Sequence, residues 1–160
     1  MRPSFTGSVY FSAWMIGQLV FSALNAHAQM VLAPPAAKMV AEAKQQVTMI
    51  DMAGLKAAVD AKDAGLLLDV RLPSEQAASG RVPGALSMPR GTVEFAIWPK
   101  VGFPDKTDLG QKITVYCGTS WRSALAAKSL KDLGFTIVRA VDMRMADWLD
   151  ARYPVEKSTQ

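Results

Sequence analysis

The stretch that decides the fold covers residues 113–123 and reads ITVYCGTSWRS. Its first four residues, Ile113 to Tyr116, combine apolar, β-branched and aromatic side chains, which predicts a strand. Residues 123–133 then carry the apolar spacing of a helix, which Gly134 closes. The only cysteine of the chain, Cys117, is therefore expected in a tight turn between a strand and a helix.

This position allows two readings of Cys117. Backbone N–H groups at a helix start are unpaired and carry partial positive charge, so they favour a thiolate, the reactive form of cysteine. Arg122 adds a full positive charge in the same turn. The alternative is a buried structural cysteine at a strand end, because unpaired cysteine is among the most buried residue types. These few residues leave both readings open.

Outward from this stretch, short apolar runs alternate with helical patterns. Asp51 and Ser74 have the positions of helix N-caps. We predict strands near 47–50, 66–70, 85–88, 112–116 and from 136 onward, helices over 52–61, 74–79, 91–97, 123–133 and 144–152, and a surface loop over 98–111. Such alternation predicts an α/β domain with a mainly parallel sheet and helices on both faces.

Ligands of such sheets bind outside the carboxyl ends of the strands. Cys117 lies at that end of its predicted strand, and Asp69 and Arg71 lie at that end of theirs. We expect the three to converge, which favours a reactive cysteine over a structural one. Arg71 and Glu75, four residues apart, form a candidate ion pair beside them.

The first 28 residues are predicted to be a cleavable signal peptide. Arg2 provides a positive start, residues 9–24 are largely apolar, and residues 26–28 read Ala-His-Ala before the expected new terminus at Gln29. An uncleaved membrane anchor is the alternative, but polar residues interrupt this stretch. We therefore expect a periplasmic or secreted protein without stable membrane insertion, with a leader and short helix over 29–45 and one domain over 46–157.

Loss of the signal peptide limits the chemistry. His27 is the only histidine, so the mature chain can form no Cys–His pair, no Ser–His–Asp triad and no histidine-ligated or multi-cysteine metal site. A nucleophile would need backbone dipoles and Arg or Lys for activation. We expect no metal and no cofactor. The formal net charge of +4 contains no Lys/Arg block, so it suits small anions and gives no argument for nucleic acid.

Three groups of residues resemble features of the rhodanese domain. The resemblance covers about residues 46–156. It rests on Leu-Asp-Val-Arg at 68–71, Glu75, Gly-Arg-Val-Pro-Gly-Ala at 80–85, Tyr116-Cys117 with Arg122-Ser123, Trp148, and Tyr-Pro-Val-Glu at 153–156.

The resemblance implies a three-layer fold with a five-stranded sheet, and it implies sulfurtransferase chemistry. The Cys117 thiolate would attack the outer sulfur of a small anionic donor such as thiosulfate. The resulting persulfide would pass its sulfur to a thiol or cyanide. The implied substrate-binding residues are Gly118, Thr119, Ser120, Trp121, Arg122 and Arg71, with Asp69 and Ser123 in support.

The length of the turn separates two chemistries within this architecture. Cys117 and Arg122 bound six residues. The phosphatases that resemble this architecture carry a Cys-x5-Arg loop, which is one residue longer and has room for a tetrahedral phosphate. The shorter loop favours a single sulfur atom.

The chain departs from the family pattern at three places. Ser120 stands where glycine is common, so we expect a strained positive φ there. Gly118 replaces a residue that is often basic, and Met143-Arg144 replaces a Gly-Gly pair. These departures support the alternative of a catalytically inactive module that binds a partner or senses redox state.

Overall fold

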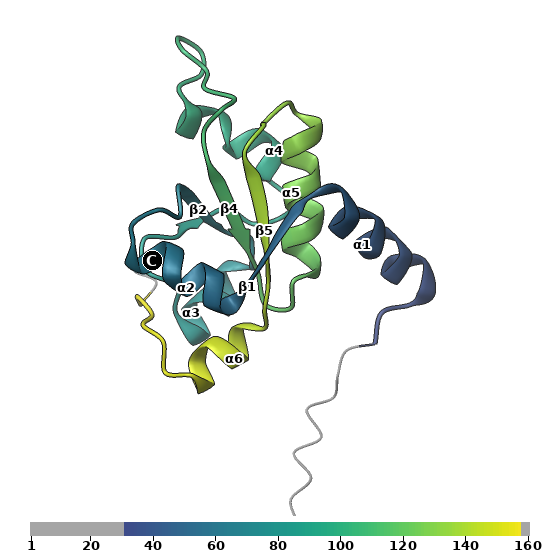
Figure 1. The fold of residues 1–160 in the computed structure, drawn as a ribbon, viewed down its shortest axis with the longest axis vertical. Helices are drawn as coiled ribbons and strands as arrows, with labels where there is room; N and C mark the ends of the chain where they lie inside the picture. The colour runs from purple at the N-terminus through teal and green to yellow at the C-terminus, as the bar shows by residue number, and fades with distance from the viewer. Residues whose placement is uncertain (1–30, 158–160) are drawn as a thin grey trace, which may run out of the picture. The chain divides into compact units, whose positions relative to one another are not determined.

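The computed structural model describes residues 31–157, so the predicted signal peptide lies outside the described residues. Five parallel strands form one sheet in the order β1-β5-β4-β2-β3 (Figure 1). The strands are β1 (Thr48–Asp51), β2 (Leu66–Asp69), β3 (Leu86–Ser87), β4 (Ile113–Tyr116) and β5 (Val138–Asp142). The predicted α/β fold with a parallel sheet is confirmed.

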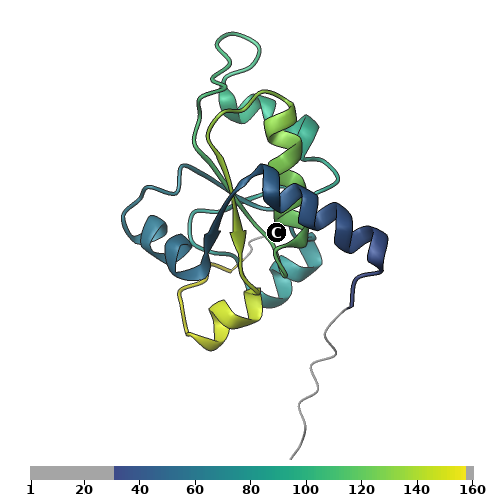
Figure 2. The same ribbon diagram turned by 45° about the vertical axis from the view of Figure 1, so that its right-hand side comes forward.

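Helices cover both faces of this sheet. They are α1 (Pro34–Gln46), α2 (Met52–Asp60), α3 (Pro73–Ser79), α4 (Val93–Ala96), α5 (Trp121–Asp132) and α6 (Met145–Asp150), with a 3₁₀ turn at Trp98–Val101. Figure 2 shows α1, α4 and α5 on one side of the sheet and α2 and α6 on the other. Among residues 31–157, no helix combines the length and the apolar character that crossing a bilayer requires.

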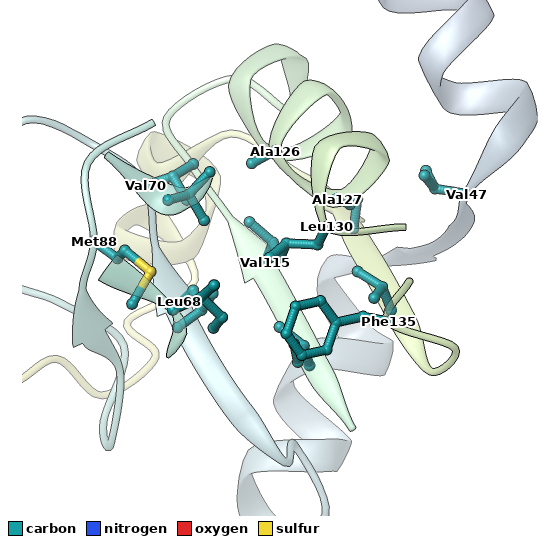
Figure 3. Packing of buried hydrophobic residues seen from close by; sticks show 14 of the residues in the cluster. Val47, Leu68, Val70, Met88, Val115, Ala126, Ala127, Leu130 and Phe135 are labelled. Atoms are coloured by element: carbon teal, nitrogen blue, oxygen red, sulfur yellow. The ribbon is translucent and has the colours of Figure 1, made fainter. Parts of the chain in front are cut away.

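The core consists of one apolar cluster on each face of the sheet. β4 is buried along its whole length, as expected for a central parallel strand. Because side chains alternate along a strand, Val115 joins the first cluster and Tyr116 the second. Figure 3 shows the first cluster, in which Val115 lies near Leu130 of α5 and Phe135.

Two helix starts test the predicted caps. Asp51 is the N-cap of α2, because its carboxylate accepts from the N–H of Gly54 at 2.7 Å. The predicted cap at Ser74 is wrong, since α3 already begins at Pro73. Proline suits the first helical position, where no N–H is needed. The carboxylate of Glu75 closes this turn by accepting from the N–H of Leu72 at 2.9 Å.

Segments at both ends of the described chain belong to the folded domain. Val40 and Ala43 of α1 are buried, and α1 packs against α5. At the other end, the indole of Trp148 donates to the carbonyl of Pro154 at 3.0 Å. Arg81 and Glu156 exchange two backbone hydrogen bonds. The last described residues are thereby fixed to the segment before β3.

Candidate active-site loop

Residues 117–120 connect β4 to α5 at the carboxyl edge of the sheet, and with the first turn of α5 they form the predicted loop 117–122. α5 begins at Trp121, two residues earlier than the sequence suggested, so Trp121 and Arg122 belong to its first turn. Gly118, Thr119, Trp121 and Arg122 are half-buried.

The amides of this loop are available for a ligand. Within residues 31–157, the N–H groups of 118–123 donate to no backbone or side-chain acceptor, whereas the next one, of Ala124, donates to the carbonyl of Ser120. The first N–H groups of a helix lack a carbonyl one turn earlier, and here the preceding loop extends that set. Consecutive free amides of this kind favour a bound anion.

Ser120 adopts the left-handed conformation, with φ +67° and ψ −17°. The expected positive φ is therefore confirmed. This conformation costs a residue with a side chain about 1–2 kcal/mol. Ser120 is only 3% exposed, and its carbonyl accepts from the hydroxyl of Ser123 at 2.8 Å. Packing and hydrogen bonds hold the strained residue in place.

Cys117 itself is 0% exposed and belongs to the first apolar cluster. Its Sγ lies 3.7 Å from Oγ of Ser123, which also donates toward the carbonyl of Val141 at 3.2 Å. The sulfur is thus buried in the core at the start of the loop, directly before the residues with free amides in the chain.

Arg122 is joined to α3 by a two-pronged ion pair. Its Nη1 and Nη2 lie 2.6 and 2.7 Å from the two carboxylate oxygens of Glu75. Hydrogen bonding from Arg122 lowers the pKa of Glu75 against the effect of burial, and the N–H of Leu72 lowers it further. The same pair raises the pKa of Arg122. The guanidinium of Arg122, expected as a positive charge beside Cys117, is therefore paired with the carboxylate of Glu75.

The space around residue 118 favours glycine, which the sequence alone did not reveal. A Cβ at this position would lie 3.2 Å from Nη2 of Arg122 and 3.6 Å from Oε1 of Glu75. A larger residue there would crowd the ion pair. Position 118 therefore has no basic side chain of its own, but the guanidinium of Arg122 lies close to its backbone.

Arg71 is bound by groups within the domain. Arg71 is 2% exposed, and its Nε and Nη2 bind the carboxylate of Asp69 at 3.0 and 2.7 Å. Its remaining donors bind the hydroxyl of Ser79 and the carbonyl of Gly80, both at 2.6 Å. A guanidinium occupied in this way fixes the strand end to α3, and the substrate-binding role implied for Arg71 stays a prediction.

The predicted pair between Arg71 and Glu75 is wrong. Arg71 reaches only the main-chain oxygen of Glu75, at 3.5 Å. Spacing of four residues brings side chains together only within one helix, and α3 starts at Pro73, between the two.

Sequence reasoning missed the role of Tyr116. Its hydroxyl donates to Asp69 at 2.7 Å and accepts from the N–H of Val82 at 3.0 Å. Burial and the adjacent carboxylate of Asp69 raise the pKa of Tyr116, so the phenol stays protonated. The buried tyrosine directly before the cysteine links β2, β4 and the segment before β3.

The segment after β5 approaches the loop through its backbone. The N–H of Met145 donates to the carbonyl of Gly118 at 3.0 Å. Met143 turns into the second apolar cluster, and Arg144 pairs with Asp147 on the surface. The side chains of Met143 and Arg144, which replace the Gly-Gly pair, therefore both have partners outside residues 117–122.

A family model for the rhodanese-like domain matches residues 51–151. No curated protein gives a significant match. Among solved structures, one similar protein is a protein of unknown function from Rhodopseudomonas palustris, described as a possible tyrosine phosphatase. It is 28% identical with a TM-score of 0.66, over 79% of this chain and 97% of that one.

Two further solved structures are sulfurtransferases. A homodimeric polysulfide-sulfur transferase from Wolinella succinogenes is 27% identical with a TM-score of 0.61, over 77% of this chain and 88% of that one. A human single-domain sulfurtransferase is 25% identical with a TM-score of 0.53, over 65% and 96% of the respective chains.

Proposed function

The chain belongs to the rhodanese-like domain family, and on that basis we propose that it is a sulfurtransferase that carries sulfur as a persulfide on Cys117. The observation that carries the proposal is the run of six free amides, 118–123, that directly follows the cysteine. They suit the thiolate, the persulfide anion and the charge of an anionic donor.

The proposed reaction has two displacements. The Cys117 thiolate attacks the outer sulfur of a donor such as thiosulfate, the donor S–S bond breaks, and sulfite leaves with its electron pair. A thiolate or cyanide then attacks the outer sulfur of the persulfide and releases the Cys117 thiolate. No proton carrier is needed between two anions, which agrees with a domain in which residues 46–157 contain no histidine.

Burial of Cys117 defines where the sulfur would move. An S–S bond is about 2 Å long, so a transferred sulfur would extend from the buried Sγ toward the free amides of the loop. The acceptor would meet this outer sulfur and not the cysteine itself.

The loop length supports sulfur chemistry over phosphate chemistry, although one similar protein is described as a possible tyrosine phosphatase. Cys117 and Arg122 enclose four residues, and the guanidinium of Arg122 is held by Glu75. The loop is one residue shorter than a Cys-x5-Arg loop, so it leaves less room for a tetrahedral phosphate.

The test is intact-protein mass spectrometry after incubation with thiosulfate or polysulfide. We expect the wild type to gain one sulfur atom and to release sulfite from thiosulfate, and Cys117→Ser to do neither. The control is Ser129→Ala, because the hydroxyl of Ser129 accepts from Arg90 and has no contact with the loop, so this variant should load like the wild type. Absence of sulfur on the wild type with every donor would refute the proposal.

A second candidate is favoured by one observation, the complete burial of Cys117. In that case the domain binds a partner without turnover. It predicts a folded wild type whose cysteine resists both sulfur donors and iodoacetamide until the protein is unfolded.

We further propose export, with cleavage after Ala28. The support is the sequence pattern of residues 1–28 alone. Purification from a Gram-negative host should give a periplasmic protein whose mass begins at Gln29, and an intact cytoplasmic chain would contradict it.

A further inference from the structure

A side chain of α1 reaches the carboxyl edge of the sheet, although α1 lies outside the matched residues 51–151. Nζ of Lys44 donates to Oδ2 of Asp142 at 3.1 Å. Lys44 is 30% exposed and Asp142 55% exposed, so the pair lies at the surface. Asp142 is the last residue of β5, the strand beside β4.

Asp142 adjoins the residues that hold the loop. The preceding carbonyl, of Val141, accepts from Oγ of Ser123, which lies 3.7 Å from the sulfur of Cys117. Burial raises the pKa of Asp142, but hydrogen bonding from Lys44 and from the hydroxyl of Ser120 outweighs it, so the pKa lies below its usual range. The carboxylate therefore pairs with α1 directly after the carbonyl that accepts from Ser123 of the loop.

A strained residue persists only where its surroundings hold it. Ser120 needs such support, since its φ is +67° and it carries a side chain. The strand end at 141–142 is one part of that support, and Lys44 binds the side chain of its last residue, Asp142.

We infer that Lys44 and Asp142 form a positioning pair that holds the Cys117 loop, so that a helix outside the matched family region tunes the candidate site. Of the two rates measured below, only sulfur transfer from thiosulfate depends on the proposed function. The geometric part concerns the loop and can be tested without sulfur transfer.

A simpler effect must be separated from positioning, because the charge of Lys44 also attracts anionic donors. The two explanations differ in sign at Asp142. Removing its negative charge should speed reaction with an anion if only the local charge matters. It should slow the reaction if the pair holds the loop.

The experiment compares Lys44→Met, Lys44→Arg and Asp142→Ala with Lys38→Met. Lys38 is a matched control, since it lies on the same helix and pairs only with Glu42, at 3.8 Å on the surface. Two rates are measured for each full-length variant: sulfur transfer from thiosulfate, and modification of Cys117 by neutral iodoacetamide.

We expect Lys44→Met and Asp142→Ala each to lower the turnover with thiosulfate by about two- to fivefold, the range of an exposed ion pair. Both should speed modification by iodoacetamide, because a looser loop uncovers the buried sulfur. Lys44→Arg should retain both wild-type rates, and Lys38→Met should change neither.

Equal rates for Lys44→Met and Lys38→Met would overturn the inference, as would faster turnover of Asp142→Ala. If wild type accepts no sulfur, the proposed function fails, and the iodoacetamide rates still decide whether the pair holds the loop. Unfolding curves of all four variants identify any that are misfolded. If Lys44→Met is among them, Lys44→Arg still tests the inference, because it keeps the charge and should keep both wild-type rates.

Discussion

Ser120 shows at the scale of one residue how this loop differs from a relaxed turn. Its φ of +67° is a conformation that glycine adopts without steric cost. Its carbonyl also accepts from the hydroxyl of Ser123 at 2.8 Å, so strain and a polar contact occur at the same residue.

Two substitutions separate strain from contact. Ser120→Gly and Ser120→Ala both lose the hydroxyl, but only glycine relieves the backbone. We expect the glycine variant to exceed the alanine variant by about 1 kcal/mol in free energy of unfolding, measured with urea. Equal stabilities would mean that the left-handed conformation costs nothing here.

Tyr116 offers a second prediction at this scale. Tyr116→Phe leaves the buried N–H of Val82 without its acceptor and Asp69 without one donor. We expect a loss of about 1–3 kcal/mol in free energy of unfolding. The control is Tyr153→Phe, because the hydroxyl of Tyr153 has no hydrogen bond within the described chain. A similar loss of stability in Tyr116→Phe and Tyr153→Phe would mean that the hydrogen bonds of Tyr116 do not cause the effect.

At the scale of elements, the ion pair between Arg122 and Glu75 joins α5 to α3 across the loop. The pKa of Glu75 lies below its ordinary value of 4.5, so its contribution to stability is present above pH 4.5 and is lost as the pH falls through the lower, folded-state value. Partial exposure limits this contribution to below about 1 kcal/mol.

The matching prediction uses acid unfolding. Between about pH 6 and about pH 3, limits set by ordinary carboxyl pKa values, the melting temperature of wild type should fall more than that of Glu75→Gln. Glu42→Gln, which removes a surface pair on α1, should follow wild type. Parallel curves for wild type and Glu75→Gln would contradict a stabilising role of the pair.

The elements also show what sequence reasoning can reach. The strand, turn and helix around Cys117 were predictable, because apolar runs and helical spacing are local signals. The partners of Arg71 and Arg122 were not, since both depend on where α3 begins. The cap of α3 is Leu72, two residues before the expected Ser74, and Glu75 in its first turn pairs with Arg122. Burial of Cys117 likewise depends on packing of distant segments.

At the scale of the whole domain, α1 extends the folded unit beyond the matched residues 51–151. Val40 is buried against the rest of the domain, whereas the neighbouring Met39 is 58% exposed. This contrast within one helix provides a direct test of its contribution.

We expect Val40→Ala to lower the free energy of unfolding of the whole domain by about 1–2 kcal/mol, through lost burial and a residual cavity. Met39→Ala should change it by less than about 0.5 kcal/mol. Chemical denaturation followed by tryptophan fluorescence provides both values. An unchanged Val40→Ala would place α1 outside the cooperative unit.

The presence of a single cysteine has a consequence for the loaded protein. Two-thiol carriers can discharge by closing an internal disulfide, which expels the outer sulfur as sulfide. This chain has no second thiol for that step, and its one cysteine is enclosed by the core. A sulfur bound there would wait for an incoming acceptor, so the lifetime of the charged state would be set by the supply of acceptor and not by the protein itself.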